Sequence, residues 1–388
     1  MTDTLPSTST DAPLKGVRIA DFSSMMAGPY CSRWLADLGA EVWKVEPPEG
    51  DFMRSRVPMR DGRSAYFAHL NAGKRSVVLD LKKPDDLATA RELIAHSDVM
   101  LENYRPGVMK RFGLDWDSVC GASPGLVYCS ISGYGQSGEG SERAAYAPIV
   151  HAASGLDLAL LELQDDQDRP ANCGIQIADV LAATFAGFAI QTALLHRWRS
   201  GTGQHIDLAL MDGLMSLMPF EMQSLQFPGH HSRNLYKPLP ATDGFVVVAP
   251  LSQGNFVSMC KAMGHPEWLN DARFCKPGPR ADHWQELLDA MATWTVRHGA
   301  IECQALLEAG GVPASRYVPL AEVIHDPQMA RRGGVREIHD RSGTMLASGL
   351  PFMLSASRLP QAQCAPDLGE HSDELMALLK HGQLAAQH

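Results

Sequence analysis

Residues 16–46 read GVRIADFSSMMAGPYCSRWLADLGAEVWKVE, and this stretch decides the fold. Its apolar run at 16–22 predicts a strand, the segment 29–39 predicts a helix, and the run at 40–46 predicts a second strand. Gly39 ends the helical segment, where a stop signal is expected. A strand, a helix and a strand in this order predict one βαβ unit of a parallel sheet.

The same alternation continues outward from this unit. Residues 76–81 and 99–104 have the pattern of strands and flank a helical segment at 84–97, which begins with proline. Short continuous apolar runs at 126–132 and 205–211 suit strands that are covered on both faces. We therefore predict an α/β protein with a parallel sheet and helices on both sides.

Length, charge and cysteine content limit the remaining possibilities. The 388 residues exceed one typical core, and the sequence becomes loop-like at 227–244, so we predict a large and a smaller domain with a boundary near 225. Residues 1–13 are rich in Ser, Thr and Pro and carry no secretory signal, which predicts a mobile tail. The net charge of −10 disfavours nucleic-acid and anionic-membrane surfaces.

The eight cysteines are scattered, without the spacing of a zinc site or a disulfide framework. This pattern favours reduced thiols in the cytoplasm and no metal. The apolar stretch 175–195 is as long as a membrane span, but it contains Asp179. A helix buried in the core of a large domain explains it more simply.

Three short motifs lack the context that their chemistry needs. Gly133, Gly135 and Gly138 form G-x-G-x-x-G after a strand, but no helix is predicted next to receive a pyrophosphate, so we interpret them as a turn. The G-x-S-x-G pattern at 121–125 precedes a strand instead of following one. NAGKRS at 71–76 lacks the first glycine of a P-loop.

Asp179 is a lone carboxylate at the start of an otherwise apolar helical segment. One interpretation is a helix N-cap, whose side-chain oxygen accepts the N–H groups of the first turn. The other is an ionised, poorly hydrated carboxylate that attacks an acyl carbonyl. The residue pattern alone leaves both open.

Six blocks of sequence carry a resemblance that bears on this choice. They are LKGVRIADFSSMMAGPYCSRWLADLGAEVWKVEPPEGD (14–51), NAGKRSVVLDLKKPDD (71–86), DVMLENYRPGVMKRFGLDW (98–116), LVYCSISGYGQSG (126–138), IADVLAATFAGFAIQTALLHRWRSGTGQHIDLALMDG (177–213) and APDLGEHSDELMALL (365–379). Together they resemble the family III CoA-transferases, the group of formyl-CoA transferase and carnitine CoA-transferase. The same superfamily contains the α-methylacyl-CoA racemases.

The resemblance implies an α/β fold with a Rossmann-like large domain, residues 14–225 and 331–388, and a smaller α/β domain, residues 226–330. It also implies a homodimer of interlocked rings. Coenzyme A would be a co-substrate, used with an acyl-CoA and a free carboxylic acid, and no metal would take part.

The resemblance also implies roles for individual residues. Asp179 falls on the catalytic aspartate, which would attack a donor acyl-CoA to form a mixed anhydride and then an aspartyl-CoA thioester. Tyr146 matches a tyrosine near the acyl group. Residues that would contact CoA are Met25, Met26, Ala27, Asn71, Lys74, Arg75, Asn103 and Arg111.

This chain departs from two known groups of the superfamily, and these departures limit the reactions that it could catalyse. Racemases of the superfamily carry a His-Asp pair where this chain has Tyr146 and Ala147, so the second acid/base group that racemisation needs is missing. Formyl-CoA transferase has a glutamate at the position of Ala147 and a tetraglycine loop. This chain has neither, which disfavours formate–oxalate exchange.

Cationic side chains near or after the presumed site suggest the substrate class. His151, Arg233 and Lys237, with His230 and His231, could pair with a second substrate carboxylate. We therefore predict a dicarboxylic substrate, with succinyl-CoA as donor and a C4–C5 acid such as mesaconate, citramalate or itaconate as acceptor. An α-methylacyl-CoA racemase and a non-catalytic CoA-binding relative remain as alternatives.

Overall fold

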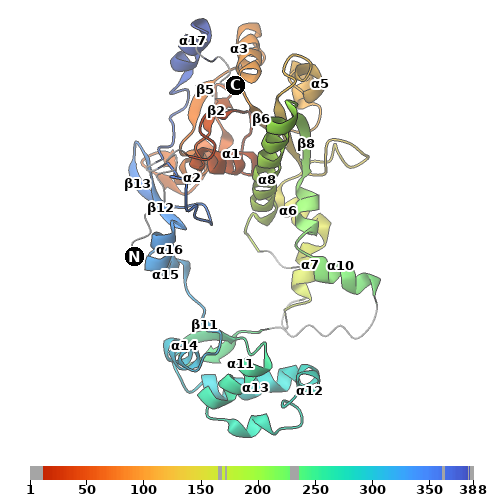
Figure 1. The fold of residues 1–388 in the computed structure, drawn as a ribbon, viewed down its shortest axis with the longest axis vertical. Coiled ribbons are helices and arrows are strands. Elements are labelled where there is room, and N and C mark those ends of the chain that lie inside the picture. The colour runs from red at the N-terminus through yellow and green to blue at the C-terminus, as the bar shows by residue number, and fades with distance from the viewer. Residues whose placement is uncertain are drawn as a thin grey trace. The chain divides into compact units, whose positions relative to one another are not determined.

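The structure is a computed structural model, and it describes residues 12–164, 168–170, 173–227, 236–360, 363–382 and 384 (Figure 1). The chain divides into two compact units, Met1–Pro219 with Pro327–His388, and Phe220–Asp326. The smaller domain predicted from the sequence, residues 226–330, overlaps the second unit.

Among the described residues, six strands form the central sheet of the first unit. They lie in the order β5-β2-β1-β6-β7-β8, and every neighbouring pair is parallel. Counted along the chain this is 3-2-1-4-5-6, the strand order of a Rossmann sheet. The predicted parallel sheet is confirmed. Its strands are β1 (Arg18–Asp21), β2 (Glu41–Glu46), β5 (Arg75–Val78), β6 (Val99–Glu102), β7 (Val127–Ser132) and β8 (Gln204–Ala209).

Helices cover both faces of this sheet (Figure 1). Side chains alternate along each strand, so Ile19 packs into the core on one face and Ala20 into the core on the other. One face is covered by α1 (Ala27–Asp37), α6 (Ala147–Ser154), α8 (Ile177–Ser200) and α9 (Leu210–Met215). The other is covered by α3 (Pro84–Ala95), α4 (Val108–Phe112), α5 (Trp116–Val119) and α17 (Ser372–Lys380).

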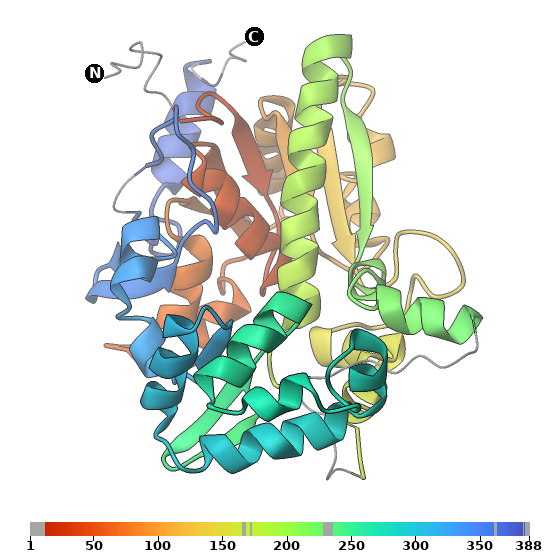
Figure 2. The ribbon, with the colours of Figure 1, turned by 60° about the horizontal axis from the view of Figure 1, so that its bottom comes forward.

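The long helix α8 runs beside α1, β7 and β8 (Figure 2). Ala182, Ala186 and Ile190 on its inner side are fully buried in the core. By length and composition alone α8 could cross a membrane. As the sequence predicted, one side of it belongs to the core, whereas its other side carries the exposed Phe188 and Trp198.

Shorter elements complete the first unit. Helix α2 packs on the β12–β13 hairpin through a small cluster that includes Ala68, Ala72 and Ile338. These elements are a 3₁₀ helix (Phe52–Ser55), β3 (Met59–Arg60), β4 (Arg63–Ser64), α2 (Ala65–Asn71), α7 (Leu156–Leu161), α16 (Pro327–Arg332), β12 (Val335–Asp340) and β13 (Gly343–Ser348).

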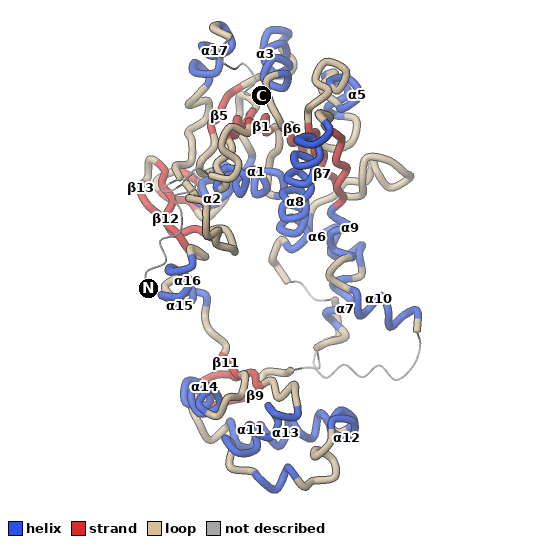
Figure 3. The backbone as a smooth tube through the Cα atoms, in the orientation of Figure 1, coloured by secondary structure: helices blue, strands red, loops and turns tan. Residues whose placement is uncertain are grey.

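The second unit has a core of its own. Its strands form an antiparallel sheet in the order β11-β10-β9, and helices pack on it (Figure 3). Phe256, Met259 and Leu287 are fully buried there. The elements from residue 219 onward are α10 (Pro219–Gln226), β9 (Leu239–Ala241), β10 (Gly244–Val248), α11 (Gln253–Ala262), a 3₁₀ helix (Pro266–Leu269), α12 (Pro277–Asp282), α13 (Trp284–Thr295), α14 (Ala300–Ala309), β11 (Ala314–Arg316) and α15 (Leu320–Val323).

Candidate active site

The chain changes direction across the sheet between β1 and β6. From β1 it proceeds outward to β2 and β5, and then returns to β6 on the other side of β1. In open parallel sheets, ligands bind beyond the carboxyl ends of the strands at such a switch point. The segments that follow β1 and β6 are joined there. Asn103 Oδ1 accepts the Ser24 N–H at 2.8 Å, and Asn103 Nδ2 donates to the Ser24 carbonyl at 2.8 Å.

A cavity of about 220 Å³ opens at this point. It brings together five residues that the sequence assigned to the site, although they are up to 154 positions apart between Met25 and Asp179. Strand ends and helix starts supply most of the lining, as expected for a site at a switch point. The lining residues are Ser24, Met25, Ala27, Asn103, Tyr104, Arg105, Ile131, Ser132, Gly133, Ala145, Tyr146, Asp179 and Leu210.

Asp179 is the third residue of α8, because the N-cap position is Gln176. The N-cap interpretation of Asp179 is therefore wrong. Its carboxylate instead faces the backbone N–H of Ala27 at the start of α1. Burial raises the pKa of Asp179 to about 6, and the nearby Ala27 N–H opposes this shift only in part. The carboxylate is thus weakly hydrated, which suits a nucleophile.

The N-terminus of α1 meets this carboxylate. Ala27 is the first residue of α1, so its N–H has no acceptor inside the helix. The partial positive charge at a helix N-terminus favours an anion placed there. Gly28 follows, and a Cβ at Gly28 would lie 2.2 Å from Ser23 Cβ, so only glycine allows this close packing.

The Ser24–Met26 segment is held in one conformation from several sides. Met25 has a φ of 67°, in the left-handed region that non-glycine residues rarely adopt. Its N–H donates to Asp51 Oδ1 at 3.3 Å. Tyr66 Oη donates to Met26 Sδ at 2.9 Å, and the Met26 side chain contacts the small core around α2 instead of lining the cavity.

A buried ionic network lies beneath this segment. Lys44 Nζ donates to Asp51 Oδ2 at 2.8 Å and, at 3.0 Å, to the carbonyl of Ser23, which directly precedes the segment. Lys74 Nζ donates to Asp21 Oδ2 at 3.1 Å and to Asn71 Oδ1 at 2.8 Å. Asn71 and Lys74 are both buried. The structure thus places these two predicted CoA contacts inside the protein, where they support the cavity wall and offer no polar atom to a ligand.

Arg75 and Arg111 do not line the Asp179 cavity either. Arg75 forms ion pairs with Glu374 and, at 3.6 Å, with Glu41, and its guanidinium lies over the Trp43 ring. Arg111 is exposed on α4. Because CoA is a long molecule that extends well beyond its thioester, contact of either arginine with CoA stays a prediction.

The residues predicted to bind the substrate lie in different surroundings. Tyr146, predicted near the acyl group, lines the cavity and is largely exposed. His151 is buried, and its Nε2 accepts the Ala178 N–H at 3.1 Å, so this nitrogen is not available to a substrate. Lys237 belongs to the second unit and donates to Gln285 Oε1 at 3.2 Å. Arg233, with its neighbouring histidines, lies outside the described residues.

Arg105 is a site residue that the sequence analysis missed. Among the described residues that line the cavity, it is the only cation, and its side chain is exposed. It follows Asn103 by two positions in the ENYRPG block, directly after β6. Its place after a strand end that reaches the switch point was the signal that could have identified it.

The glycine-rich loop contributes close packing. Gly133 lines the cavity, and a Cβ at this position would lie 2.2 Å from Ala145 Cβ. Gly135 and Gly138 have φ values of 90° and 88°. No helix begins between 133 and 146, a stretch that the structure describes in full. The interpretation as a turn is therefore confirmed.

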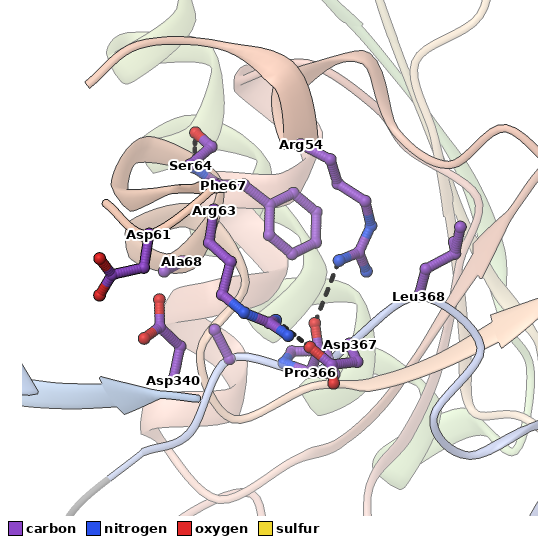
Figure 4. Close-up of a pocket in the computed structure, with 12 residues that line it drawn as sticks. Arg54, Asp61, Arg63, Ser64, Phe67, Ala68, Asp340, Pro366, Asp367 and Leu368 are labelled. Atoms are coloured by element: carbon purple, nitrogen blue, oxygen red, sulfur yellow. Dashed lines mark hydrogen bonds and ion pairs between the residues drawn. The ribbon is translucent and has the colours of Figure 1, made fainter. Parts of the chain in front are cut away.

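A second cavity of about 420 Å³ lies between the β3–β4 hairpin and the C-terminal segment (Figure 4). Several of its charged side chains are already engaged. Arg63 pairs with Asp367, and Arg54 binds both oxygens of Glu46 and the Pro366 carbonyl. The contacts with Asp367 and Pro366 attach the C-terminal segment to the N-terminal part of the first unit. In the described part of the chain, no group of His, Cys, Asp or Glu side chains could hold a metal ion.

Comparison with known proteins identifies relatives along nearly the whole chain. The sequence model of CoA-transferase family III matches residues 14–372. A succinyl-CoA–D-citramalate CoA-transferase from Chloroflexus aurantiacus is 35% identical over 94% of this chain and 93% of its own length. A succinate–glutarate CoA-transferase from Agrobacterium fabrum is 33% identical over 95% of this chain and 96% of its own.

Solved structures agree with this similarity. A CAIB/BAIF family protein from Brucella suis superposes with a TM-score of 0.82 and is 32% identical. The match covers 95% of this chain and all of that protein. At this identity the likeness extends over fold and sequence together.

Proposed function

The chain belongs to CoA-transferase family III, and from this premise we propose that it transfers CoA from succinyl-CoA, or another dicarboxylic acyl-CoA, to a free C4–C5 dicarboxylate. Citramalate, mesaconate and itaconate are the acceptors we favour. Relatives named for citramalate, glutarate and mesaconate support this substrate class. The observation that carries the proposal is the Asp179 carboxylate, with its raised pKa, facing the N-terminus of α1 in the cavity.

The proposed reaction exchanges bonds of similar energy and needs no ATP. An Asp179 oxygen attacks the thioester carbonyl, and the C–S bond breaks. CoA leaves as a thiolate, and the donor acyl group stays on Asp179 as a mixed anhydride. The thiolate then attacks the Asp179 carbonyl carbon, which releases the donor acid and leaves an aspartyl-CoA thioester. An oxygen of the acceptor carboxylate attacks the carbonyl carbon of this thioester, the C–S bond breaks, and a second mixed anhydride forms as CoA thiolate leaves. The CoA thiolate then attacks the acyl carbon of the acceptor in this anhydride. This attack gives the new acyl-CoA and releases free Asp179.

The site geometry suits these steps. Each attack develops negative charge on a carbonyl oxygen, and the Ala27 N–H at the start of α1 is a fixed donor close to the reacting carboxyl. Burial that raises the pKa of Asp179 also leaves its anion poorly hydrated and ready to attack. Met25, Asn103 and Tyr146 would hold the pantetheine and acyl ends of the substrate in the same cavity.

We propose Arg105 as the partner of the distal carboxylate. Its guanidinium can bind both oxygens of a carboxylate, and it lies on the cavity wall with Asp179. This assignment replaces His151, which is engaged in the protein interior. The proposal includes an interlocked homodimer in the cytoplasm, as the resemblance implied.

The racemase alternative finds less support at the site. A racemase requires a second acid/base group beside the substrate α-carbon. Here Tyr146 is followed by Ala147, which is buried as the first residue of α6 and carries no titratable group. The presence of the Asp179 carboxylate in the cavity argues against the non-catalytic alternative.

The decisive experiment is a transfer assay with succinyl-CoA and a panel of carboxylates, followed by mass spectrometry of the CoA esters. We expect new dicarboxyl-CoA esters from the parent protein and none from Asp179→Ala. Arg105→Gln should raise KM for the dicarboxylate more than tenfold and leave KM for a monocarboxylate of the same length unchanged. Transfer to monocarboxylates alone would refute the substrate class, and exchange of an α-proton without transfer would identify a racemase.

A further inference from the structure

His151 makes a hydrogen bond that the reaction scheme does not use. It lies on α6 with 5% of its surface exposed, and its Nε2 accepts the backbone N–H of Ala178 at 3.1 Å. Ala178 directly precedes the nucleophile in the first turn of α8. The contact thus connects α6 to the start of the helix that carries Asp179.

The first turn of a helix leaves N–H groups without acceptors, and a side chain at the N-cap usually accepts one of them. In α8 the N-cap residue Gln176 makes no such bond. An acidic residue at the third position commonly turns back as well and accepts the backbone N–H of the N-cap residue. Asp179 holds that position, but its carboxylate faces the Ala27 N–H of α1 in the cavity.

We propose that His151 is a positioning residue that takes over the capping of α8 and thereby leaves Asp179 free to act as the nucleophile. His151 supplies an acceptor from a neighbouring helix to the Ala178 N–H. The first turn of α8 is then held in place without the Asp179 side chain. This inference rests on the proposed role of Asp179 in CoA transfer.

The environment of the imidazole fits an acceptor. A ring nitrogen that accepts an N–H must be unprotonated, and burial lowers the pKa of His151, although Asp157 on α7 opposes this shift. Nδ1 carries the proton in this tautomer and faces Cys173 Sγ at 3.9 Å. A cationic imidazole would also be unfavourable beside the positive end of α8.

The chain allows a matched pair of variants that separates acceptor geometry from size. In His151→Gln, the amide oxygen can reach the position of Nε2 and accept the Ala178 N–H. In His151→Asn, the amide oxygen lies one bond shorter, near the position of Nδ1, and cannot reach it. Both variants are polar, so a general requirement for a buried polar group would treat them alike.

Two measurements test the proposal in the full-length protein. Hydrogen exchange at the Ala178 amide should be slow in the parent and in His151→Gln, and at least tenfold faster in His151→Asn. For succinyl-CoA-dependent transfer, His151→Gln should keep kcat within about threefold. His151→Asn should lower kcat by about 10- to 100-fold with KM for succinyl-CoA nearly unchanged, as expected when a reacting group is displaced.

The outcomes separate this inference from the proposed function. Rapid exchange at Ala178 in the parent, or equal exchange in the two variants, would refute the capping role whether or not the protein transfers CoA. Equal kcat values for the two variants would refute the positioning role. A parent protein that protects Ala178 but transfers no CoA would refute the proposed function and, with it, the claim that His151 serves catalysis.

Discussion

At the scale of single residues, Asp179 combines a helix-start position with a raised pKa. The carboxylate is charged in the reactive state, yet burial makes that charge unfavourable. The ionised carboxylate therefore has a higher free energy in the folded protein than in water. This difference is relieved when the group reacts and loses its charge. Two predictions follow from the direction and size of the shift.

The first prediction concerns the pH dependence of activity. Because Asp179 attacks only as the anion and its pKa is about 6, kcat/KM for succinyl-CoA should fall about tenfold per pH unit as the pH drops below 6. A rate profile between pH 5 and 8 measures this. Activity that stays constant down to pH 5 would show that the nucleophile titrates near its ordinary pKa.

The second prediction concerns stability. The pKa of Asp179 is about 6 in the folded protein, against an ordinary value of 3.8. The contribution of Asp179 to the free energy of unfolding is therefore greatest below pH 4, and it is lost as the pH rises through 6. Asp179→Asn keeps an acceptor for Ala27 but cannot ionise. At pH 8 it should raise the free energy of unfolding by roughly 2–3 kcal/mol while abolishing transfer.

Urea unfolding of parent and Asp179→Asn at pH 8 and at pH 4 tests this account. The difference between the two proteins should be much smaller at pH 4, because the carboxyl in the folded protein is then neutral, as the amide is. A variant that is less stable at pH 8 would mean that the ionised carboxylate is favourably solvated in the folded protein.

At the scale of elements, the Ser24–Met26 segment after β1 is supported by buried charged side chains. Lys44 pairs with Asp51 while both side chains are nearly inaccessible, and Asp51 also accepts the Met25 N–H. Removing one partner of a buried pair leaves the other charge without compensation. The conformation of Met25, and with it the place of Ala27, therefore depends on this pair.

We expect Lys44→Met to lower the free energy of unfolding by about 3–5 kcal/mol, because Asp51 would remain buried without its cation. Arg75→Ala is the matched control, since it removes a cation of the same sheet from a partly exposed pair. It should cost less than about 1 kcal/mol. Chemical unfolding monitored by fluorescence compares them, and equal losses would contradict the structural role of the Lys44–Asp51 pair.

At the scale of the whole molecule, the side of α8 that faces away from the core exposes large aromatic side chains. Phe188 and Trp198 expose 70% and 82% of their surface. Large aromatic side chains on one exposed helix face are typical of an interface. A second copy of this chain is the partner that the family resemblance implied.

We therefore expect a dimer of about 84 kDa by light scattering, twice the chain mass of 42.2 kDa. If the two rings are interlocked, tagged and untagged dimers mixed under native conditions should not exchange subunits, because separation requires unfolding. After joint unfolding and refolding, hybrid dimers should appear. A monomer mass would refute the dimer, and rapid native exchange would refute the interlocking.

The sequence by itself determined the local elements and the class of the enzyme. Strand and helix patterns depend on residues close in the chain, so the βαβ unit at 16–46 and the parallel sheet were predictable. The proposed nucleophile Asp179 and the predicted CoA contacts Ala27 and Asn103 came from the family resemblance, and the structure places all three at one cavity.

Only the tertiary structure decided how individual polar side chains are used. Lys74 and His151 were predicted to face ligands, but the fold buries them among protein partners. Arg105 was overlooked, yet it reaches the cavity. The physical reason is that a polar side chain acts through whichever partner and solvent exposure the fold supplies. Those partners come from distant parts of the chain, which no local pattern records.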